Sequence, residues 1–386
     1  MVPQRIGIVV AEPSGDLLAA GLMDALRELL PAVQFEGVAG PLMRESGIDQ
    51  WEPMDSLSVM GLFEVLQHLP RLVRLRSRLL ARWRDTPPLA FIGVDAPDFN
   101  LTLESRLREA GVPTVHYVSP TVWAWRAGRV KKIRQAVDLL LTIFPFETGF
   151  LAQRHVPAHY VGHPLAFDMP MEPDREGARA ALGLAADTPV LALLPGSRGG
   201  EVSRIARPFL ETASALRVEL PDLQVVVPLV NEKTRLIFEE QLGETAPQLD
   251  PVIALDQTRV ALAAADVVLV ASGTATLEGL LSKRPMVVGY KANAATYALV
   301  QMLGLVKVRH VAMANLLADE RLAPELIQAA CEPGQLLPPL LEFFRNAGLR
   351  EQIAQRYADI HRQLRTDTNR AAAEAVVALL RERGLV

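Results

Sequence analysis

Short apolar runs alternate with polar loops and helical patterns along most of this chain. In the first part, the apolar runs cover residues 5–11, 89–94, 114–118 and 139–144. Each loop that follows contains Gly, Pro or Asp and leads toward a helical pattern. Parallel strands are apolar along their whole length because helices cover both faces of their sheet. The order of strand, loop and helix therefore predicts βαβ units.

A second series of the same kind follows a proline-containing stretch at residues 163–174, which we interpret as a linker. Its apolar runs cover residues 190–194, 224–228, 252–255, 266–271 and 285–290. We predict an α/β fold with two Rossmann-like parallel-sheet domains that face each other across a cleft. The expected parts are residues 1–165, residues 166–340 and a helical tail at 341–386, which would pack back on the first domain or on a partner subunit.

Composition excludes several classes of protein. The chain has 386 residues, of which 50% are hydrophobic, and a formal net charge of −4, so intrinsic disorder is excluded. A disulfide scaffold is excluded because Cys331 is the single cysteine. Neither half is strongly basic, so we expect no nucleic-acid partner. The N-terminal stretch is typical of a strand rather than a signal peptide, and no apolar run is long enough to span a bilayer. We expect a cytoplasmic protein.

Two loops in the second series are suited to an anion such as a diphosphate. The loop LLPGSRGGE at 193–201 contains Gly196, Ser197 and Arg198 between a strand and a helix, where backbone N–H groups and the helix dipole favour negative charge. The alternative is an ordinary glycine turn. The loop ASGTATLE at 271–278 places hydroxyls at another helix start, and its alternative is a capping box.

Two loops in the first series carry acidic groups. In GVDAPDFN at 93–100, Asp95 directly follows a predicted strand and could accept a proton from a substrate hydroxyl. Asp98 is better placed to cap the next helix. In EPSGD at 12–16, Glu12 could hold a sugar hydroxyl, with Ser14 as a hydroxyl ligand and Asp16 as a cap; a capped turn is the alternative.

Two further segments have an open interpretation. The loop at 116–126 includes Trp125 and Arg126, which suit a sugar or a lipid headgroup, although core packing is equally compatible. The stretch at 61–83 has an apolar helical stripe and a second face of arginines, which is typical of a helix at a membrane interface or of a core helix with a solvated outer face. The sequence has no Asp-x-Asp pair, and we expect no metal site.

The motifs together resemble one family of GT-B glycosyltransferases, the lipid-A-disaccharide synthases. The resemblance is carried, in order, by EPSGD (12–16), GVAGPLM (37–43), SVMG (58–61), DAPDFN (95–100), HYVSPTVWAWR (116–126), LLPGSRG (193–199), ASGTATLE (271–278), PMVVGY (285–290) and NLLA (315–318). Ala11 and Ala314 depart from the family, which usually has Gly and Pro at these positions.

The resemblance implies an inverting transfer without a cofactor or a metal. The donor would be UDP-2,3-diacylglucosamine and the acceptor 2,3-diacylglucosamine 1-phosphate, giving a beta-1,6-linked disaccharide 1-phosphate and UDP. The enzyme would be peripheral on the cytoplasmic face of the inner membrane, and a homodimer is compatible with the apolar tail. The alternatives are another GT-B-like UDP-sugar enzyme, such as an epimerase or a transferase with a different acceptor, and a non-catalytic nucleotide-binding module.

The resemblance also implies roles for individual residues. Asp95 would be the base for the acceptor 6-hydroxyl, and Arg198 would offset the charge on the departing UDP. The nucleotide-sugar site would comprise Gly196, Ser197, Ser272, Gly273, Thr274, Glu278 and Asn315. The acceptor site would comprise Glu12, Ser14, Asp16, Asp98, Trp125 and Arg126. The membrane surface would comprise Phe63, Val65, Leu66, Leu69, Leu72 and Val73.

Overall fold

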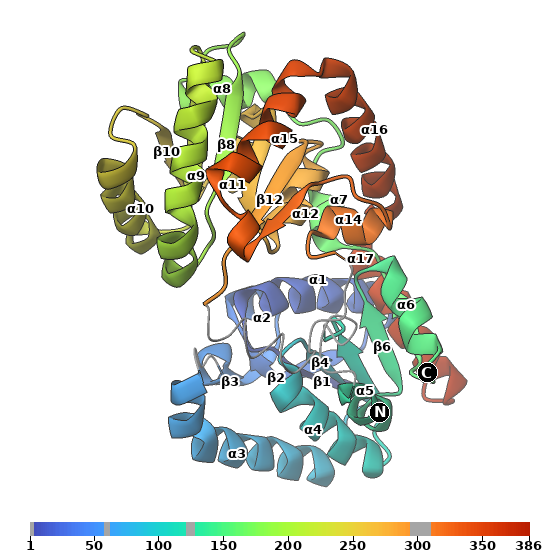
Figure 1. The fold of residues 1–386 in the computed structure, drawn as a ribbon. Coiled ribbons are helices and arrows are strands. Elements are labelled where there is room, and N and C mark those ends of the chain that lie inside the picture. The colour runs from blue at the N-terminus through green and yellow to red at the C-terminus, as the bar shows by residue number, and fades with distance from the viewer. Residues whose placement is uncertain (1–3, 58–61, 121–127, 294–309) are drawn as a thin grey trace. The chain divides into compact units, whose positions relative to one another are not determined.

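The computed structural model describes residues 4–57, 62–120, 128–293 and 310–386, and within 62–68 it describes the backbone alone. The chain divides into two compact units (Figure 1). Unit 1 contains Met1–Phe167 and Leu364–Val386, and unit 2 contains Asp168–Gln363. No helix in the described ranges is long and apolar enough to cross a membrane.

Unit 1 is built on a parallel sheet of seven strands in the order β3-β2-β1-β4-β5-β6-β7. The strands are β1 (Arg5–Val9), β2 (Gln34–Ala39), β3 (Asp49–Pro53), β4 (Ala90–Val94), β5 (Thr114–Tyr117), β6 (Leu139–Thr142) and β7 (Ala158–Tyr160). Every residue of β4 is buried, as expected for a central strand with helices on both faces.

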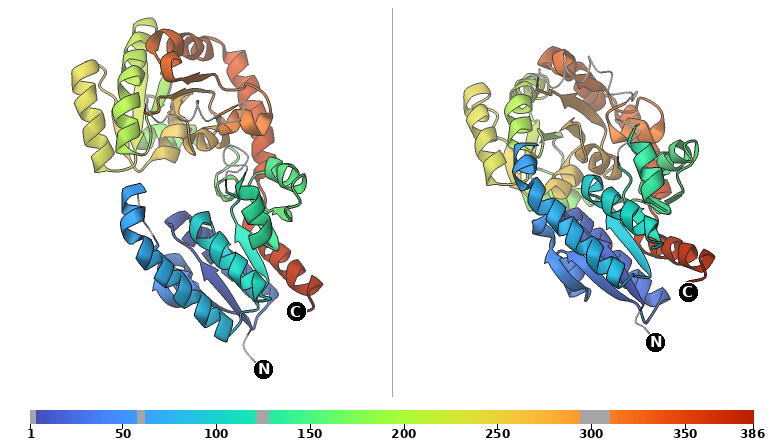
Figure 2. Two further views of the ribbon diagram at one scale, coloured as in Figure 1. Left: turned by 60° about the horizontal axis from the view of Figure 1, so that its bottom comes forward. Right: turned by 90° about the horizontal axis from the view of Figure 1, so that it is seen from below.

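Helices cover both faces of this sheet. The helices of unit 1 are α1 (Pro13–Leu29), α2 (Pro41–Glu45), α3 (Leu62–Asp85), α4 (Pro97–Glu109), α5 (Arg129–Ala136), α6 (Pro145–Ala152) and α17 (Thr368–Glu382), and α7 (Pro164–Asp168) leads into unit 2. Alternate residues of β4 point to opposite faces. Ile92 joins a cluster with α1 and α17, and Phe91 joins another with α3 and α4. Figure 2 shows α3 and α4 side by side over one face.

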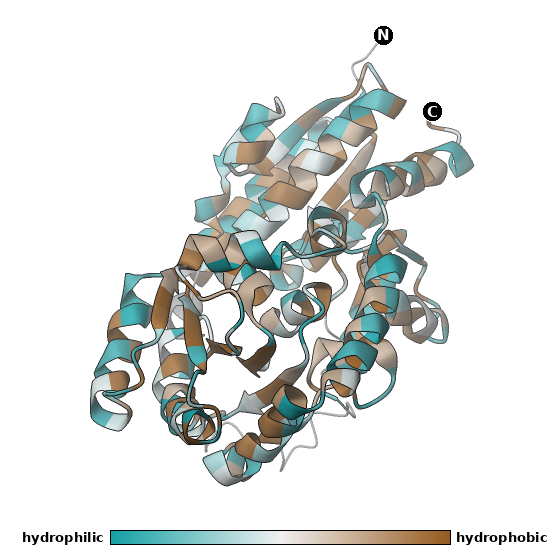
Figure 3. Ribbon diagram, turned by 90° about the horizontal axis from the view of Figure 1, so that it is seen from above, coloured by the Kyte–Doolittle hydropathy of each residue, from teal (hydrophilic) through white to brown (hydrophobic). Residues whose placement is uncertain are grey.

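Unit 2 has a parallel sheet of six strands in the order β10-β9-β8-β11-β12-β13. The strands are β8 (Val190–Leu194), β9 (Gln224–Leu229), β10 (Val252–Leu255), β11 (Val267–Ala271), β12 (Met286–Tyr290) and β13 (Glu325–Ile327). The helices are α8 (Arg175–Leu182), α9 (Gly199–Glu219), α10 (Glu232–Thr245), α11 (Thr258–Ala264), α12 (Ala275–Leu281), α14 (Met313–Ala318), α15 (Pro333–Arg345) and α16 (Ala347–Leu364). The strands are largely hydrophobic, whereas the helices have both polar and apolar positions (Figure 3).

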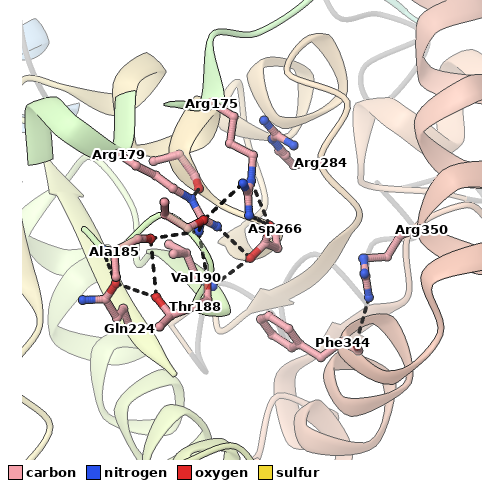
Figure 4. Close-up of polar contacts among 12 residues, drawn as sticks. Arg175, Arg179, Ala185, Thr188, Val190, Gln224, Asp266, Arg284, Phe344 and Arg350 are labelled. Carbon is pink, nitrogen blue, oxygen red and sulfur yellow. Dashed lines mark hydrogen bonds and ion pairs between the residues drawn. The ribbon is translucent and has the colours of Figure 1, made fainter. Parts of the chain in front are cut away.

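A partly buried polar cluster joins the amino ends of β8 and β11 (Figure 4). Asp266 accepts hydrogen bonds from the Arg179 guanidinium at 2.9 Å and from the Val190 N–H at 2.9 Å, and it also pairs with Arg175. Burial lowers the pKa of Arg284 to about 10, and the charge of Asp266 opposes that effect. Asp266 therefore stabilises the amino-terminal end of the sheet, opposite to the strand ends where a ligand would bind.

The fold class expected from the sequence, an α/β protein with two parallel Rossmann-like sheets, is confirmed. Four strands were absent from the sequence interpretation: β2, β3, β7 and β13. The last three lack a buried apolar run, and β2 carries a buried glutamate, Glu36, whose carboxylate bonds Arg5 and the Trp83 indole. These strands are formed through their neighbours in the sheet rather than through their own apolar pattern.

The predicted tail does not form one part. Residues 341–363 belong to unit 2, whereas residues 364–386 belong to unit 1. The apolar face of α17 is buried against α1 in the same chain, and Leu380 and Val376 lie in the core of unit 1. The division follows from packing, which the helical periodicity of the tail could not specify.

The return of the chain to unit 1 involves a buried histidine. The Leu165 N–H donates to His163 Nδ1 at 3.2 Å, and the ring centroid of His163 lies 5.1 Å from that of Phe144. The main-chain N–H of His163 donates to the carbonyl of Leu364, the last residue of α16 before the chain continues to α17. Burial lowers the pKa of His163 to about 4, consistent with a neutral ring whose Nδ1 is an acceptor.

We expect unit 1 to lose stability as the pH is lowered from about 6.5 to about 4. In this window the unfolded chain binds a proton at His163 that the folded chain excludes, and the linkage amounts to roughly 3 kcal/mol. Tryptophan fluorescence during urea unfolding measures this unit, because all four tryptophans precede residue 168. The substitution His163→Gln should flatten the dependence, and the exposed control His159→Asn should preserve it. An unchanged slope in His163→Gln would contradict this assignment.

Candidate active site

The carboxyl ends of parallel strands meet at one edge of each sheet, and ligands bind there in open α/β folds. In unit 1 this edge carries the loops after β1, β4 and β5. In unit 2 it carries the loops after β8 and β11, which are neighbouring strands with Leu194 opposite Val270. The two loops predicted to bind an anion are therefore adjacent at one edge of unit 2.

Asp95 lies directly after β4 in an unusual backbone conformation. Its φ is 49° and that of Ala96 is 44°, so two successive non-glycine residues are left-handed. The Asp95 N–H donates to the Tyr117 carbonyl at 2.8 Å, which keeps the turn attached to β5. Left-handed conformations of this kind persist where the surrounding structure imposes them, and they cluster at functional sites. The half-buried carboxylate at this strand end has the location expected of a base.

Asn100, which the sequence interpretation did not single out, holds this turn. Its side chain is fully buried, and Nδ2 lies 2.8 Å from the Asp95 carbonyl oxygen and 3.4 Å from those of Val9 and Val94. Asn100 is the last residue of the DAPDFN motif. Membership of this motif was the only feature of the sequence that could have drawn attention to Asn100. No sequence pattern predicts which main-chain carbonyls a helical asparagine will contact.

Asp98 does not cap α4, contrary to the expectation from the sequence. The helix begins at Pro97, directly after the left-handed turn, so its N-cap is Ala96, which provides no side-chain hydrogen bond. Asp98 is already the second residue of the helix. The exposed Asp98 carboxylate instead pairs with Arg129 at 2.6 Å. It remains accessible to a ligand but has a protein partner.

The three acidic or hydroxyl residues after β1 have different environments. Glu12 and Ser14 are exposed near the start of α1. Asp16 is 2% exposed, and its carboxylate accepts hydrogen bonds from the N–H groups of Gly40 at 3.0 Å, Leu42 at 2.9 Å and Met43 at 3.1 Å. Asp16 therefore fixes the start of α2 to α1. Because its oxygens are occupied by the backbone, we remove Asp16 from the proposed acceptor site.

The loop after β8 has the conformation expected of a close backbone approach. Gly196 has φ 120°, and Glu201 occupies the space beside it; the Ser197 N–H donates to the Glu201 carboxylate at 3.3 Å. Arg198 is the N-cap residue of α9, and its side chain is 85% exposed with one distant contact, 3.8 Å to Glu201. The guanidinium is therefore available to an anionic ligand at this helix start.

The loop after β11 is not a capping box. Thr274 is the N-cap of α12 but makes no side-chain capping bond, and the Ser272 hydroxyl donates to the Val311 carbonyl at 3.3 Å. Gly273 has φ 155°, and both Gly273 and Thr274 are exposed. Burial raises the pKa of the Glu278 carboxyl, and the charge of Arg259 partly opposes it. Glu278 lies one turn into the helix behind these exposed groups.

Asn315 is buried and has no amide group left for a ligand. Its Nδ2 donates to the Ala323 carbonyl at 2.7 Å and to Glu325 at 2.9 Å, and its Oδ1 accepts from the Ala323 N–H at 2.8 Å. The same Glu325 oxygen accepts from the N–H groups of Val311 and Ala312. Since Ser272 also contacts Val311, Asn315 shapes the wall behind the loop rather than offering a direct contact.

The remaining predicted residues are divided between described and undescribed positions. Trp125 and Arg126, and the side chains of Phe63, Val65 and Leu66, lie outside the described residues. On α3, Leu69 is 48% exposed and Val73 is 41% exposed, whereas Leu72 packs partly against the core. Across the described ranges, no group of three or more His, Cys, Asp or Glu side chains could hold a metal ion.

The two parallel sheets and the loops at their carboxyl ends define a class of protein, the α/β proteins with a GT-B-like fold. The structure is similar to a glycosyltransferase involved in lipopolysaccharide biosynthesis, WaaG, with a TM-score of 0.56 and 12% identity over 96% of this chain and 99% of that one. It is also similar to a putative UDP-N-acetylglucosamine 2-epimerase from Listeria monocytogenes, with a TM-score of 0.63 and 11% identity over 99% and 97% of the two chains. At these identities the likeness defines the fold.

Sequence comparison identifies the family. The model of the lipid-A-disaccharide synthetase family matches residues 6–379. The lipid-A-disaccharide synthase of Xanthomonas campestris pv. campestris (strain 8004) is 48% identical over 382 residues, 99% of this chain and 87% of that protein. That of Serratia proteamaculans (strain 568) is 46% identical over 98% of both chains. The chain belongs to the lipid-A-disaccharide synthase family, whose members are glycosyltransferases of lipid A biosynthesis.

Replacing Asp16 by Ala should destabilise unit 1 by about 1–3 kcal/mol, because the N–H groups of Gly40, Leu42 and Met43, of which the first and last are buried, lose their acceptor. Urea unfolding followed by tryptophan fluorescence measures the change. The exposed neighbour Ser14→Ala is the control, and it should change stability by less than about 0.5 kcal/mol. If Asp16→Ala is as stable as the wild type, the structural role of Asp16 is contradicted, and Asp16 becomes a candidate for acceptor binding again.

Proposed function

We propose that this chain transfers a diacylglucosamine unit from UDP-2,3-diacylglucosamine to the 6-hydroxyl of 2,3-diacylglucosamine 1-phosphate. The products are the beta-1,6-linked disaccharide 1-phosphate and UDP. The observation that carries the proposal is the pair of adjacent glycine-containing loops after β8 and β11, one of which presents Arg198, in a chain of this family. Unit 2 then holds the donor and unit 1 supplies the base.

In the proposed reaction the oxygen of the acceptor 6-hydroxyl attacks the anomeric carbon of the donor. Asp95 accepts the proton that this hydroxyl loses. The bond from that carbon to the diphosphate oxygen breaks, and the electron pair leaves with UDP. Attack from the face opposite to the leaving group inverts the configuration. The left-handed turn at Asp95 and Ala96 supports this role, because it fixes the main chain from which the carboxylate extends.

The diphosphate is the natural ligand of the unit 2 loops. The exposed Arg198 guanidinium offsets the negative charge that grows on UDP, as a preorganised electrostatic group does. Gly196, Ser197, Ser272, Gly273 and Thr274 surround the phosphates, and Glu278 accepts hydrogen bonds from the ribose diol. No step of this proposal uses a metal ion or a cofactor.

The acceptor sugar is assigned to unit 1. Glu12 and Ser14 are exposed after β1, and Asp98 is exposed after β4, so each can reach a hydroxyl or an amide of the acceptor. Trp125 and Arg126 remain proposed acceptor residues on the strength of the family motif at 116–126. Asn315 acts indirectly by shaping the loop that contacts Ser272.

Mass spectrometry of the product formed from the two proposed substrates tests the reaction directly. The expected product appears only when both sugars are present, together with an equal amount of UDP. An epimerase would convert the sugar nucleotide without the acceptor, and a binding module would consume neither substrate. Either of these results would overturn the proposal.

Replacing Asp95 by Asn should lower turnover by about 10²–10⁴-fold while leaving UDP affinity within twofold, because the carboxylate is proposed to act as the base. Arg198→Ala should lower turnover by about 10²–10³-fold, through the loss of charge stabilisation. The exposed control Asp85→Asn should retain full activity. Turnover assays and calorimetry with UDP measure these effects. Full turnover of Asp95→Asn would refute the base assignment.

We also propose that the exposed face of α3 meets the membrane that contains the acylated substrates. Leu69 and Val73 are exposed one turn apart, and the exposed Arg71 and Arg74 lie beside them, so apolar insertion and attraction to anionic headgroups act together. The opposite side of the helix is anchored in the core through Leu75, Leu79 and Trp83. The enzyme would thereby be a peripheral protein of the cytoplasmic face of the inner membrane.

Replacing Leu69 and Val73 together by Ser should weaken binding to vesicles that contain anionic lipid. Replacing Arg71 and Arg74 by Gln should weaken it by roughly fivefold per arginine, and added salt should remove that difference. Vesicle co-sedimentation measures both effects. Val218→Ser is the control, since Val218 is 80% exposed on α9 and should not change binding. Equal binding of all variants would refute the membrane surface.

A further inference from the structure

We propose that Asn100 is a positioning residue that holds the catalytic Asp95 in its reactive orientation, acting from a buried polar cluster beneath the turn. The cluster comprises Asn100, Glu104 and His116. This inference rests on the proposed function, in which Asp95 is the base. Asn100 contacts the main chain of Asp95 rather than the substrate.

The turn that carries Asp95 requires an external restraint. Two successive non-glycine residues with positive φ cost of order 1–3 kcal/mol each, and neither Asp95 nor Ala96 gains a capping bond in return. The Asp95 N–H is bound to β5 through Tyr117, but its carbonyl is bound only through the Asn100 side chain among the described hydrogen bonds. Without that amide, one end of the strained peptide would be unrestrained.

The Asn100 amide faces three carbonyl oxygens at the ends of β1 and β4. Its nitrogen lies 2.8 Å from the oxygen of Asp95 and 3.4 Å from those of Val9 and Val94. The amide oxygen in that place would repel all three, so the electrostatics fix the orientation of the side chain. One side chain from the first turn of α4 thereby ties together two adjacent strand ends.

Glu104 and His116 fix the helix from which Asn100 extends. Glu104 is one turn further along α4, and its Oε1 lies 2.7 Å from His116 Nδ1, with both side chains fully buried. His116 is opposite Gly93 in the register of β4 and β5. A Cβ on Gly93 would overlap Glu104 Oε1 and lie 2.9 Å from Asn100 Cβ, so only glycine permits this close approach of α4.

The cluster is costly, which argues for a role beyond packing. In the described part of the chain, no hydrogen-bond partner is available to Asn100 Oδ1, Glu104 Oε2 or His116 Nε2. Burial raises the pKa of Glu104, while the charges of His116 and Lys132 oppose that shift. Buried polar atoms without partners reduce stability, and apolar residues could fill the same volume. Such features persist where they preserve a functional geometry.

The consequence for catalysis follows from the geometry of proton transfer. A base must lie within hydrogen-bond reach of the hydroxyl, and a displacement of about 1 Å costs about 10²-fold in rate. Loss of the Asn100 amide should therefore lower kcat by about 10–100-fold. Affinity for UDP, which is assigned to unit 2, should remain within twofold.

A double-mutant cycle separates positioning from simple destabilisation. The variants are Asn100→Ala, Asp95→Asn and the pair together, assayed for residual turnover at high enzyme concentration. If Asn100 acts through Asp95, then Asn100→Ala lowers kcat in the wild type but has little further effect in Asp95→Asn. If Asn100→Ala does not fold, Asn100→Ser takes its place in the cycle. Serine keeps a hydrogen-bond donor in the cluster, but its side chain is too short to reach the Asp95 carbonyl.

Thr114→Val is the matched control. Thr114 is also fully buried in unit 1, and its hydroxyl donates to the Ala136 carbonyl at 2.7 Å, at the amino end of β5. It should lower the unfolding midpoint without lowering kcat.

Two results would overturn the positioning role: wild-type kcat in Asn100→Ala, or an equal loss of turnover in both backgrounds. If Asp95→Asn itself retains full turnover, the base assignment fails, and the positioning role fails with it. A loss of activity in Asp95→Asn with none in Asn100→Ala overturns only the positioning role. The cycle thus distinguishes the failure of this inference from that of the proposed function.

Discussion

The parallel arrangement of the strands is the constraint on which the rest of the structure depends. A parallel strand cannot be followed by a tight hairpin, so each connection crosses a face of the sheet, mostly as a helix. Both faces are then covered, and β4, β8 and β11 are buried along their full lengths. Polar groups that serve a ligand are thereby confined to the loops at the strand ends.

The two ends of the sheets carry different kinds of polar group. At the amino ends in unit 2, Asp266 accepts hydrogen bonds from Arg179 and from the Val190 N–H, so the carboxylate is occupied by protein groups. At the carboxyl ends in unit 1, the main chain is strained, with positive φ at Asp95, Ala96 and the β-branched Val118. A charge pair at the amino ends in unit 2 thus contrasts with a strained main chain at the carboxyl ends in unit 1.

The sequence predicted the sheets and the loops better than it predicted what individual polar side chains do. The central strands were identifiable because burial on both faces makes them continuously apolar, whereas β13 has three half-buried residues and lacks that pattern. Asp95 was identifiable from its position after a strand. Asp16 and Asn315 were not distinguishable from ligand groups, because their partners are backbone groups 24 and 8 residues away in the chain. Such partners are brought close only by the fold.

For the same reason, the sequence indicated a role for Asp95 but not for Asn100, whose partners are brought close only by the fold. A carboxylate at a strand end can be proposed as a base from the sequence, but the amide that restrains its turn is defined only by the carbonyl oxygens of Val9, Val94 and Asp95. Gly93 completes the arrangement, since it permits α4 to approach β4 at the level of Glu104 and Asn100. The short motif around Asp95 therefore contains both the strand-end carboxylate and the amide that restrains its turn. A side chain at position 93 would displace α4, and with it the Asn100 amide, because its Cβ would overlap Glu104 and Asn100.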